Sequence, residues 1–231
     1  MQKVLEILNS DIYVEKDKKV LSNVDFSIDQ GEFVYLIGRT GSGKSSLLKT
    51  LYADFPVYNG KINIAGFSLN ELSSKQIPFL RRKIGIIFQD FQLFFDRNVE
   101  ENLTFVMQAT GWKDKTLMKH KIAEVLMNVG LSGSGKKYPH QMSGGEQQRI
   151  VIARSLLNSP EILLADEPTG NLDPKVAEEI LQLFLEINKK NGMAVLMATH
   201  NFNFLERYPA RMLKCEQGIV LDSGETVAVE K

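Results

Sequence analysis

The stretch GRTGSGKS, residues 38–45, has the residue types and the spacing that bind a nucleoside triphosphate. It fits the pattern G-x-x-x-x-G-K-[ST] in full, and it lies between the apolar stretch FVYLI and a predicted helix. Its glycines allow backbone N–H groups to surround phosphates, Lys44 carries a charge for the β- and γ-phosphates, and Ser45 offers a hydroxyl to Mg²⁺. A simple Gly/Ser loop is the alternative, but pattern and context together favour a binding site. The predicted phosphate-binding residues are Gly38, Arg39, Thr40, Gly41, Ser42, Gly43, Lys44, Ser45 and Ser46.

A second stretch, EILLADE at residues 161–167, supplies two carboxylates for the same chemistry. Its apolar residues predict a buried strand, and Asp166 stands at the carboxyl end, where open α/β sheets bind ligands and where it could hold the water shell of Mg²⁺. Because successive strand side chains point to opposite sides, Glu167 is predicted to face the γ-phosphate and to polarise a water. A positioned general base contributes about 10²–10⁴ in rate. Acidic residues at strand ends are common, so this interpretation depends on the phosphate loop.

Four further residues are candidates by position alone. Gln89 ends KIGIIFQ and could reach Mg²⁺ or the attacking water, although an ordinary strand-end polar residue is an equal alternative. His200 ends MAVLMATH and could donate to the γ-phosphate, whereas a lone histidine is usually structural. Tyr13 could stack on an adenine, a contact worth about 1–3 kcal/mol, or be a plain strand aromatic. Asp173, in the loop GNLDP, is by itself interpreted as a helix N-cap or turn residue.

The stretch HQMSGGEQQR, residues 140–149, predicts a second anion site. Ser143, Gly144 and Gly145 begin a predicted helix, and the free N–H groups and dipole of a helix start favour a phosphate. Two such sites in one small chain make sense if two copies pack head to tail, so that each closes the nucleotide of the other. The alternative is a Ser143 N-cap with Glu146 completing a capping box.

Composition sets limits on the partners of this chain. Lysine plus arginine equals aspartate plus glutamate at 28 each in 231 residues, and the pI is about 6.9. This balance does not support nucleic-acid binding or a polybasic membrane anchor. The single cysteine, Cys215, excludes an internal disulfide, and the apolar runs are too short to span a membrane. We expect a soluble cytoplasmic protein that meets a membrane only through a partner.

The elements that position these residues alternate between strands and helices at both ends of the chain. Apolar stretches predict strands in KVLEILNSDIYV, KVLSNVDFSI, EFVYLIG, GKINIAG, KIGIIFQ, EILLADE and MAVLMATH, and a closing hairpin in the tail ARMLKCEQGIVLDSGE. Helical patterns occur at Lys44–Leu51, in VEENLTFVMQAT, in TLMKHKIAEVLMNVG and in VAEEILQLFLEINKKNG, which ends at a glycine. We predict an α/β fold: a mostly parallel sheet covered by helices, an N-terminal antiparallel β patch and an inserted helical lobe.

In their order along the chain, these motifs resemble an ATP-binding cassette (ABC) ATPase. The resemblance covers essentially the whole chain and implies a single domain with a RecA-like P-loop NTPase core (residues 1–88 and 159–231) and a helical signature subdomain (residues 89–158). It implies ATP hydrolysis with Mg²⁺ in a homodimer that encloses ATP. The roles it implies are catalysis by Glu167, His200 and Gln89, metal binding by Ser45, Gln89 and Asp166, and nucleotide binding by Tyr13, Asp173, Ser143, Gly144, Gly145 and Glu146.

Within that family, FLRRKIGIIFQDFQLFFDRNVEENL and LLADEPTGNLD are most similar to the FtsE branch of bacterial cell-division ATP-binding proteins. The resemblance implies a polytopic membrane partner, FtsX-like, that docks near Phe91–Asn98, with the ATPase peripheral on the inner face of the membrane. Other division proteins are further possible partners, and the implied output is regulation of cell-wall hydrolases. Packing of the lobe's own core is the alternative role for Phe91–Asn98.

Two rival functions follow from the same motifs. Transport cassettes of the lipoprotein-release or macrolide-export type share SGGEQQR and ADEPTGNLD, so the membrane partner must distinguish them. Soluble cassettes of translation or DNA repair are disfavoured, because this chain has one cassette and no sustained heptads. The sequence departs from the family pattern at Asn201, where an aspartate usually follows the histidine, and this changes local charge but not the donor role of His200.

Overall fold

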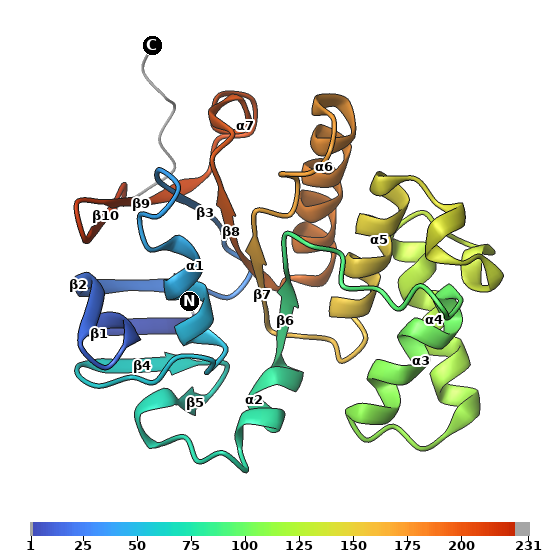
Figure 1. Cartoon of the computed structure of the whole chain (residues 1–231), viewed down its shortest axis with the longest axis horizontal. Helices are drawn as coiled ribbons and strands as arrows, with labels where there is room; N and C mark the ends of the chain where they lie inside the picture. Colours follow the sequence, from blue (N-terminus) through green and yellow to red (C-terminus); the bar gives the residue numbers. More distant parts are fainter. Residues whose placement is uncertain (1, 225–231) are drawn as a thin grey trace.

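The computed structural model describes residues 2–224, and residues 225–231 of the predicted core segment 159–231 lie outside that part (Figure 1). A six-stranded sheet has the order β10-β9-β3-β8-β7-β6, and a four-stranded sheet has the order β2-β1-β4-β5. The strands are β1 (Lys3–Glu15), β2 (Lys18–Asp29), β3 (Phe33–Ile37), β4 (Lys61–Ile64), β5 (Phe67–Ser68), β6 (Ile84–Ile87), β7 (Ile162–Asp166), β8 (Ala194–Thr199), β9 (Arg211–Glu216) and β10 (Ile219–Asp222).

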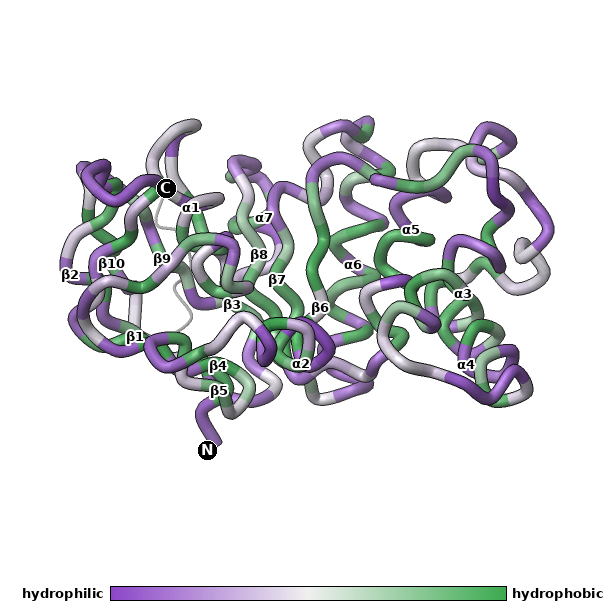
Figure 2. Tube along the Cα trace, turned by 60° about the horizontal axis from the view of Figure 1, so that its bottom comes forward, coloured by the Kyte–Doolittle hydropathy of each residue, from purple (hydrophilic) through white to green (hydrophobic). Residues whose placement is uncertain are grey.

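The six-stranded sheet is parallel except for its edge strand. The pairs β6–β7, β7–β8, β8–β3 and β3–β9 are parallel, and β10 returns antiparallel to β9 in the predicted hairpin. Every residue of β3 and β8 is buried, as expected for strands covered on both faces. Figure 2 shows hydrophobic residues running along these central strands. The predicted parallel sheet is confirmed.

The four-stranded sheet is antiparallel and lies against one face of the central sheet. β1 pairs antiparallel with β2, with several register shifts along the pair, and its residues 5–8 pair antiparallel with β4. Apolar residues of this sheet, such as Ile7, Ile28 and Ile62, are fully buried in one cluster with Leu36 and Leu164 of the central sheet. The predicted N-terminal antiparallel patch is therefore confirmed, and it forms the second wall of the core around α1 (Lys44–Leu51).

The remaining helices are α2 (Ile77–Lys83), α3 (Val99–Ala109), α4 (Lys115–Asn128), α5 (Gly144–Ser155), α6 (Pro174–Asn191) and α7 (Phe202–Arg207). The predicted helices correspond to α1, α3, α4, α5 and α6, and α6 ends at Gly192 in the left-handed conformation. The short helices α2 and α7 were not predicted, since six or seven residues show too little periodicity. Within residues 2–224, no helix is long and apolar enough to cross a membrane.

Helices α3, α4 and α5 form the helical lobe, on the opposite side of the molecule from the antiparallel sheet (Figure 1). A capping box begins α3, where Asn98 and Glu101 each accept the backbone N–H of the other. Helix α5 also packs on β6 and α6, so it links the lobe to the central sheet. The exact boundaries predicted for the lobe, residues 89–158, remain a prediction.

Candidate active site

The predicted phosphate loop joins the carboxyl end of β3 to the start of α1. Its three glycines have φ angles of 148° at Gly38, 82° at Gly41 and 102° at Gly43, which side chains other than glycine rarely adopt. Space is also limiting, because a Cβ on Gly38 would lie 2.5 Å from the Cys215 carbonyl oxygen and one on Gly43 would lie 2.9 Å from Leu21 Cγ. The loop conformation therefore depends on glycine at these positions.

Lys44 is only 4% exposed, and its ammonium group lies within the curve of this loop. Its Nζ donates to the carbonyl oxygens of Gly38 (2.9 Å) and Arg39 (3.3 Å). It also lies 3.5 Å from Glu167 Oε1. The loop thus holds a positive charge against a carboxylate, and a triphosphate would supply the anionic oxygens that this charge favours.

Ser45 and Asp166 meet from opposite elements, α1 and β7. Ser45 Oγ donates to Asp166 Oδ1 over 3.1 Å. Burial raises the pKa of the Asp166 carboxyl, the Ser45 hydrogen bond opposes that rise, and the nearby charge of Glu167 adds to it. A hydroxyl and a buried carboxylate side by side fit Mg²⁺, which prefers oxygen ligands and takes few of them from the protein.

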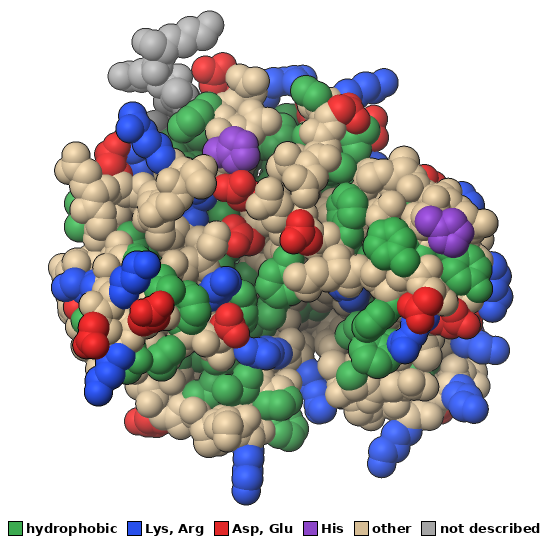
Figure 3. Space-filling model, in the orientation of Figure 1, with side chains coloured by type: hydrophobic (Ala, Val, Ile, Leu, Met, Phe, Trp, Pro, Cys, Tyr) green, Lys and Arg blue, Asp and Glu red, His purple; other side chains and the backbone are tan. Residues whose placement is uncertain are grey.

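Glu167 and His200 form a second pair beside Lys44. Glu167 Oε2 lies 3.1 Å from His200 Nδ1, and the His200 side chain is 59% exposed. The strand alternation invoked for Glu167 is wrong as an explanation, because β7 ends at Asp166 and Glu167 has a left-handed φ of 48°. That turn, rather than the pleat, directs the Glu167 carboxylate toward the phosphate loop. Figure 3 shows acidic side chains on the middle of this face.

The three weaker candidates, Gln89, Asp173 and Tyr13, lie in three different surroundings. Gln89 lies two residues beyond β6, where a Cβ on Gly170 would be 3.4 Å from its Nε2, so it faces the loop after β7. Asp173 accepts the Val176 N–H over 3.2 Å as the N-cap of α6, which confirms the capping interpretation. Tyr13 packs edge to face with Tyr58, and the structure does not bring it into contact with the carboxylate pair. Their roles toward a nucleotide remain predictions.

The start of α5 is a capping box, as the alternative interpretation predicts. Ser143 Oγ accepts the Glu146 N–H, and Glu146 Oε2 accepts the N–H (2.9 Å) and the hydroxyl (3.0 Å) of Ser143. These bonds lower the pKa of Glu146. Packing also requires glycine at position 145, because a Cβ there would lie 2.5 Å from Val176 Cγ1 on α6. A role of this helix start toward a second copy stays a prediction.

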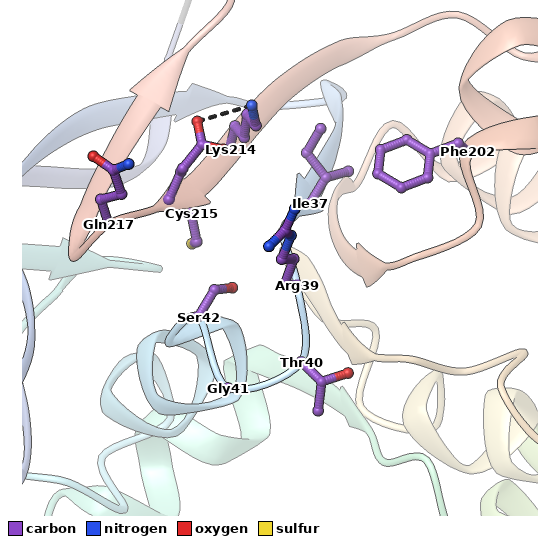
Figure 4. A pocket seen from close by; sticks show the side chains of 11 residues that line it. Ile37, Arg39, Thr40, Gly41, Ser42, Phe202, Lys214, Cys215 and Gln217 are labelled. Atoms are coloured by element: carbon purple, nitrogen blue, oxygen red, sulfur yellow. Dashed lines mark ion pairs between the residues drawn. The ribbon is translucent and has the colours of Figure 1, made fainter.

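The structure adds residues that the sequence analysis missed. Lys49, one turn after Ser45 on α1, opposes the rise that burial causes in the pKa of Asp166, and its spacing of four from Ser45 is a signal that could have identified it. A cavity of about 680 Å³ borders the loop between Gly38 and Ser42, with Phe202 of α7 and Cys215 of β9 in its wall. Figure 4 shows Cys215 pointing from β9 toward Ser42. Burial raises the pKa of this thiol to about 11, so it is a packing residue here.

Known sequences resemble this chain over most of its length. Residues 21–170 match the family described as ABC transporter. The chain is 43% identical over 201 residues to the cell division ATP-binding protein FtsE of Escherichia coli K12, which covers 87% of this chain and 90% of that protein. It is 41% identical over 201 residues to FtsE of Streptococcus pneumoniae D39, covering 87% and 86%.

Solved structures agree in fold. The cbiO1 protein of Clostridium perfringens, part of the ABC transporter complex cbiONQ, has a TM-score of 0.87 at 27% identity, covering 96% of this chain and 88% of that one. The ATP-binding cassette MJ0796, in a dimeric post-hydrolysis state bound to ADP and Pi, has a TM-score of 0.81 at 31% identity, covering 98% and 100%. These similarities confirm the predicted fold class.

Proposed function

Because this chain belongs to the ABC transporter family and is an ATPase similar to FtsE, we propose that it drives an FtsX-like membrane protein and thereby regulates cell-wall hydrolysis in bacterial cell division. ATP hydrolysis itself follows from the family. The support for the finer assignment is the identity of 41–43% to FtsE proteins of several bacteria. The structural observation that carries the activity is the meeting of Lys44, Glu167 and His200 at the loop after β3.

In this proposal each side chain has one task toward ATP. Lys44, already desolvated, binds phosphate oxygens, and the loop glycines allow backbone N–H groups to do the same. Glu167 holds the attacking water and accepts its proton, and His200, within 3.1 Å of that carboxylate, keeps it oriented and donates to the γ-phosphate. Ser45 and Asp166, with Gln89, would hold Mg²⁺, which neutralises charge on the phosphates when bound.

We further propose that the active enzyme is a dimer in which Ser143 of one copy closes the nucleotide of the other. The Ser143 N-cap lies in the helical lobe, whereas Lys44 begins α1 beside the antiparallel sheet. Figure 1 places α1 and α5 on different sides of β7 and β8. A helix start of this kind favours an anion, and the dimeric state of the MJ0796 structures supports the arrangement.

The proposed docking surface for the membrane partner consists of Phe94, Phe95, Arg97 and Phe105. Phe94 and Phe105 pack edge to face at 5.0 Å, and the Arg97 guanidinium lies 4.6 and 4.9 Å from their ring centroids. Phe95 is 56% exposed beside them. A groove of about 610 Å³ is lined in part by Phe88, Gln89 and Gln92, which come shortly before this surface in the sequence. Exposed aromatics and arginine are typical of interface hot spots.

Copurification from membranes tests the proposed partner. Phe95→Glu should reduce recovery of the bound integral protein by about tenfold or more, while ATP affinity stays unchanged, because an unpaired group buried in an apolar interface costs about 1–3 kcal/mol and a charged group costs more. Leu117→Glu is the matched control, because Leu117 on α4 is equally exposed at 56%.

Two outcomes would contradict the proposal. If Phe95→Glu and Leu117→Glu lost the bound partner equally, the docking surface would not include Phe95. Recovery of a lipoprotein-release or macrolide-export permease by the unmodified protein would replace the division assignment with a transport one.

A further inference from the structure

Gln148 is a buried amide without a polar partner. Its side chain has no exposed surface, and neither Oε1 nor Nε2 forms a hydrogen bond to any atom of residues 2–224. The neighbouring Gln147 differs, because its Nε2 donates to the carbonyl oxygens of Pro139 and Met142, both at 3.1 Å. A buried polar group that is left unpaired destabilises the conformation in which it occurs, so this amide needs an explanation.

The helical period shows which neighbours Gln148 faces. Gly144 lies four residues earlier and Gly145 three residues earlier, so both share its face of α5. A Cβ on Gly144 would lie 3.4 Å from Leu172 and 3.8 Å from Phe91, and one on Gly145 would meet Val176. Gln148 therefore lies between the segment after β6 and the loop that leads into α6.

The same conclusion follows from the other end of the helix. The Ser155 carbonyl oxygen is 3.0 Å from the Cβ position of Gly85 on β6. Gln148 lies seven residues before Ser155, which is about 10 Å along a helix. Three strand residues span the same distance, and α5 starts close to Phe91, so it runs antiparallel to β6. Gln148 therefore lies on the stretch of α5 that faces the end of β6 and the segment that follows it.

The segment beside Gln148 is held and strained. Arg154 of α5 donates to the carbonyl oxygens of Phe91 (3.1 Å) and Gln92 (2.6 Å), and Asn171 donates to that of Gln89 (3.3 Å). Gln92 itself has a left-handed φ of 48°, which costs free energy in a residue other than glycine. An unpaired amide on α5 and a strained backbone in the adjoining segment thus both disfavour the present conformation.

We infer that Gln148 is a positioning residue for ATP hydrolysis, whose amide pairs with the backbone of Phe88–Gln92 in the conformation that hydrolyses ATP. A group that is unpaired in one state and paired in another shifts the equilibrium toward the second state. Gln148 does not touch the nucleotide in this scheme, and it acts by holding Gln89 and the adjoining segment. The inference rests on the ATPase activity and on the role proposed for Gln89, and it needs no membrane partner.

The test is Gln148→Met in the purified full chain, since methionine has nearly the same length but no amide. Without nucleotide, its melting temperature should rise by about 3–6 °C because two unpaired polar atoms are removed. With Mg²⁺ and ATP, kcat should fall by roughly fivefold or more at unchanged KM, because the hydrolysing conformation loses its hydrogen bonds. If Gln148 were only structural, Gln148→Met would change the melting temperature and kcat in the same direction.

Gln147→Met is the matched control, and its melting temperature should fall because it loses two made hydrogen bonds. Hydrogen exchange gives a second measurement. ATP should slow exchange of the Phe88–Gln92 amides in the unmodified protein and not in Gln148→Met. A lower melting temperature for Gln148→Met would show that the amide is already paired, and an unchanged kcat would remove its positioning role. If the unmodified protein fails to hydrolyse ATP, the proposed function fails instead.

Discussion

Asp166 and Glu167 are adjacent residues with different surroundings. Asp166 is held at the end of β7 by the Ser45 hydroxyl, and burial raises its pKa. Glu167 lies between the Lys44 ammonium and the His200 ring. Asp166 is suited to a metal ion, because a metal offsets the cost of burying a charge. Glu167 is suited to a water molecule, because a general base must remain accessible to the water that it activates.

A first prediction concerns the apo stability of Asp166→Asn. The pKa of Asp166 is raised in the folded state, so the protonated form is favoured there, and the stability that this provides at low pH is lost as the pH rises through the folded pKa. At pH 7 the asparagine variant should therefore melt at a higher temperature than the unmodified protein. The difference should shrink as the pH falls toward the ordinary pKa of aspartate, about 4.

Calorimetry from pH 4 to 8 measures this difference. With Mg²⁺ and ATP the order should reverse, because the unmodified protein gains stability from ligand binding that the variant has lost. A variant that is less stable than the unmodified protein at pH 7 without nucleotide would show that Asp166 contributes to folding rather than to metal binding.

At the scale of elements, α5 contacts α6, and this contact brings the starts of the two helices close together. Asp173 caps α6, and Ser143 with Glu146 caps α5. The two helix starts approach because Gly145 has no side chain where Val176 packs. Gly145, the second glycine of the SGGE motif, is thus required by helix packing within one chain, independently of any anion that the motif binds.

A second prediction tests this packing. Gly145→Ala places a Cβ 2.5 Å from Val176 Cγ1, and such overpacking costs about 1–3 kcal/mol, or roughly 2–10 °C in melting temperature. Val176→Ala in the same chain should restore most of the loss. Gly144→Ala is the milder control, since its nearest neighbour would be Leu172 at 3.4 Å. Thermal unfolding of the four variants gives the coupling, and simple addition of the two single effects would exclude the contact.

At the scale of the whole molecule, the antiparallel sheet and the helical lobe lie at opposite ends of the central sheet (Figure 1). The carboxyl ends of β3, β7 and β8 supply Lys44, Glu167 and His200 from the chain itself. The helix start at Ser143 belongs to the lobe. This separation is the reason for the proposal that a second copy completes the enclosure of ATP.

A third prediction follows for self-association. Glu167→Gln should bind ATP but hydrolyse it roughly 10²–10⁴ times more slowly, since the general base is lost, and it should accumulate as a dimer with Mg²⁺ and ATP. Light scattering after size exclusion measures the mass. Adding Lys44→Ala to the same chain should return it to monomer by removing ATP binding. A Glu167→Gln chain that stays monomeric with ATP, even with its membrane partner present, would contradict the dimer.

The sequence by itself determined the long elements, the phosphate loop and the order of the motifs. These depend on local patterns: apolar strands such as β3 and β8, the periodic helix α6 with its Asp173 and Gly192 ends, and the fixed spacing from Gly38 to Ser45. Helices α2 and α7 escaped prediction because tertiary packing, not periodicity, stabilises so short a helix.

Only the tertiary structure decided how those parts meet. The approach of the Cys215 carbonyl to Gly38, the turn that directs Glu167 toward Lys44, and the unpaired amide of Gln148 all join positions far apart in the chain or depend on one backbone angle. A sequence pattern reports the face of an element on which a residue lies. It does not report which atom of another element arrives there, because that depends on packing of the whole core.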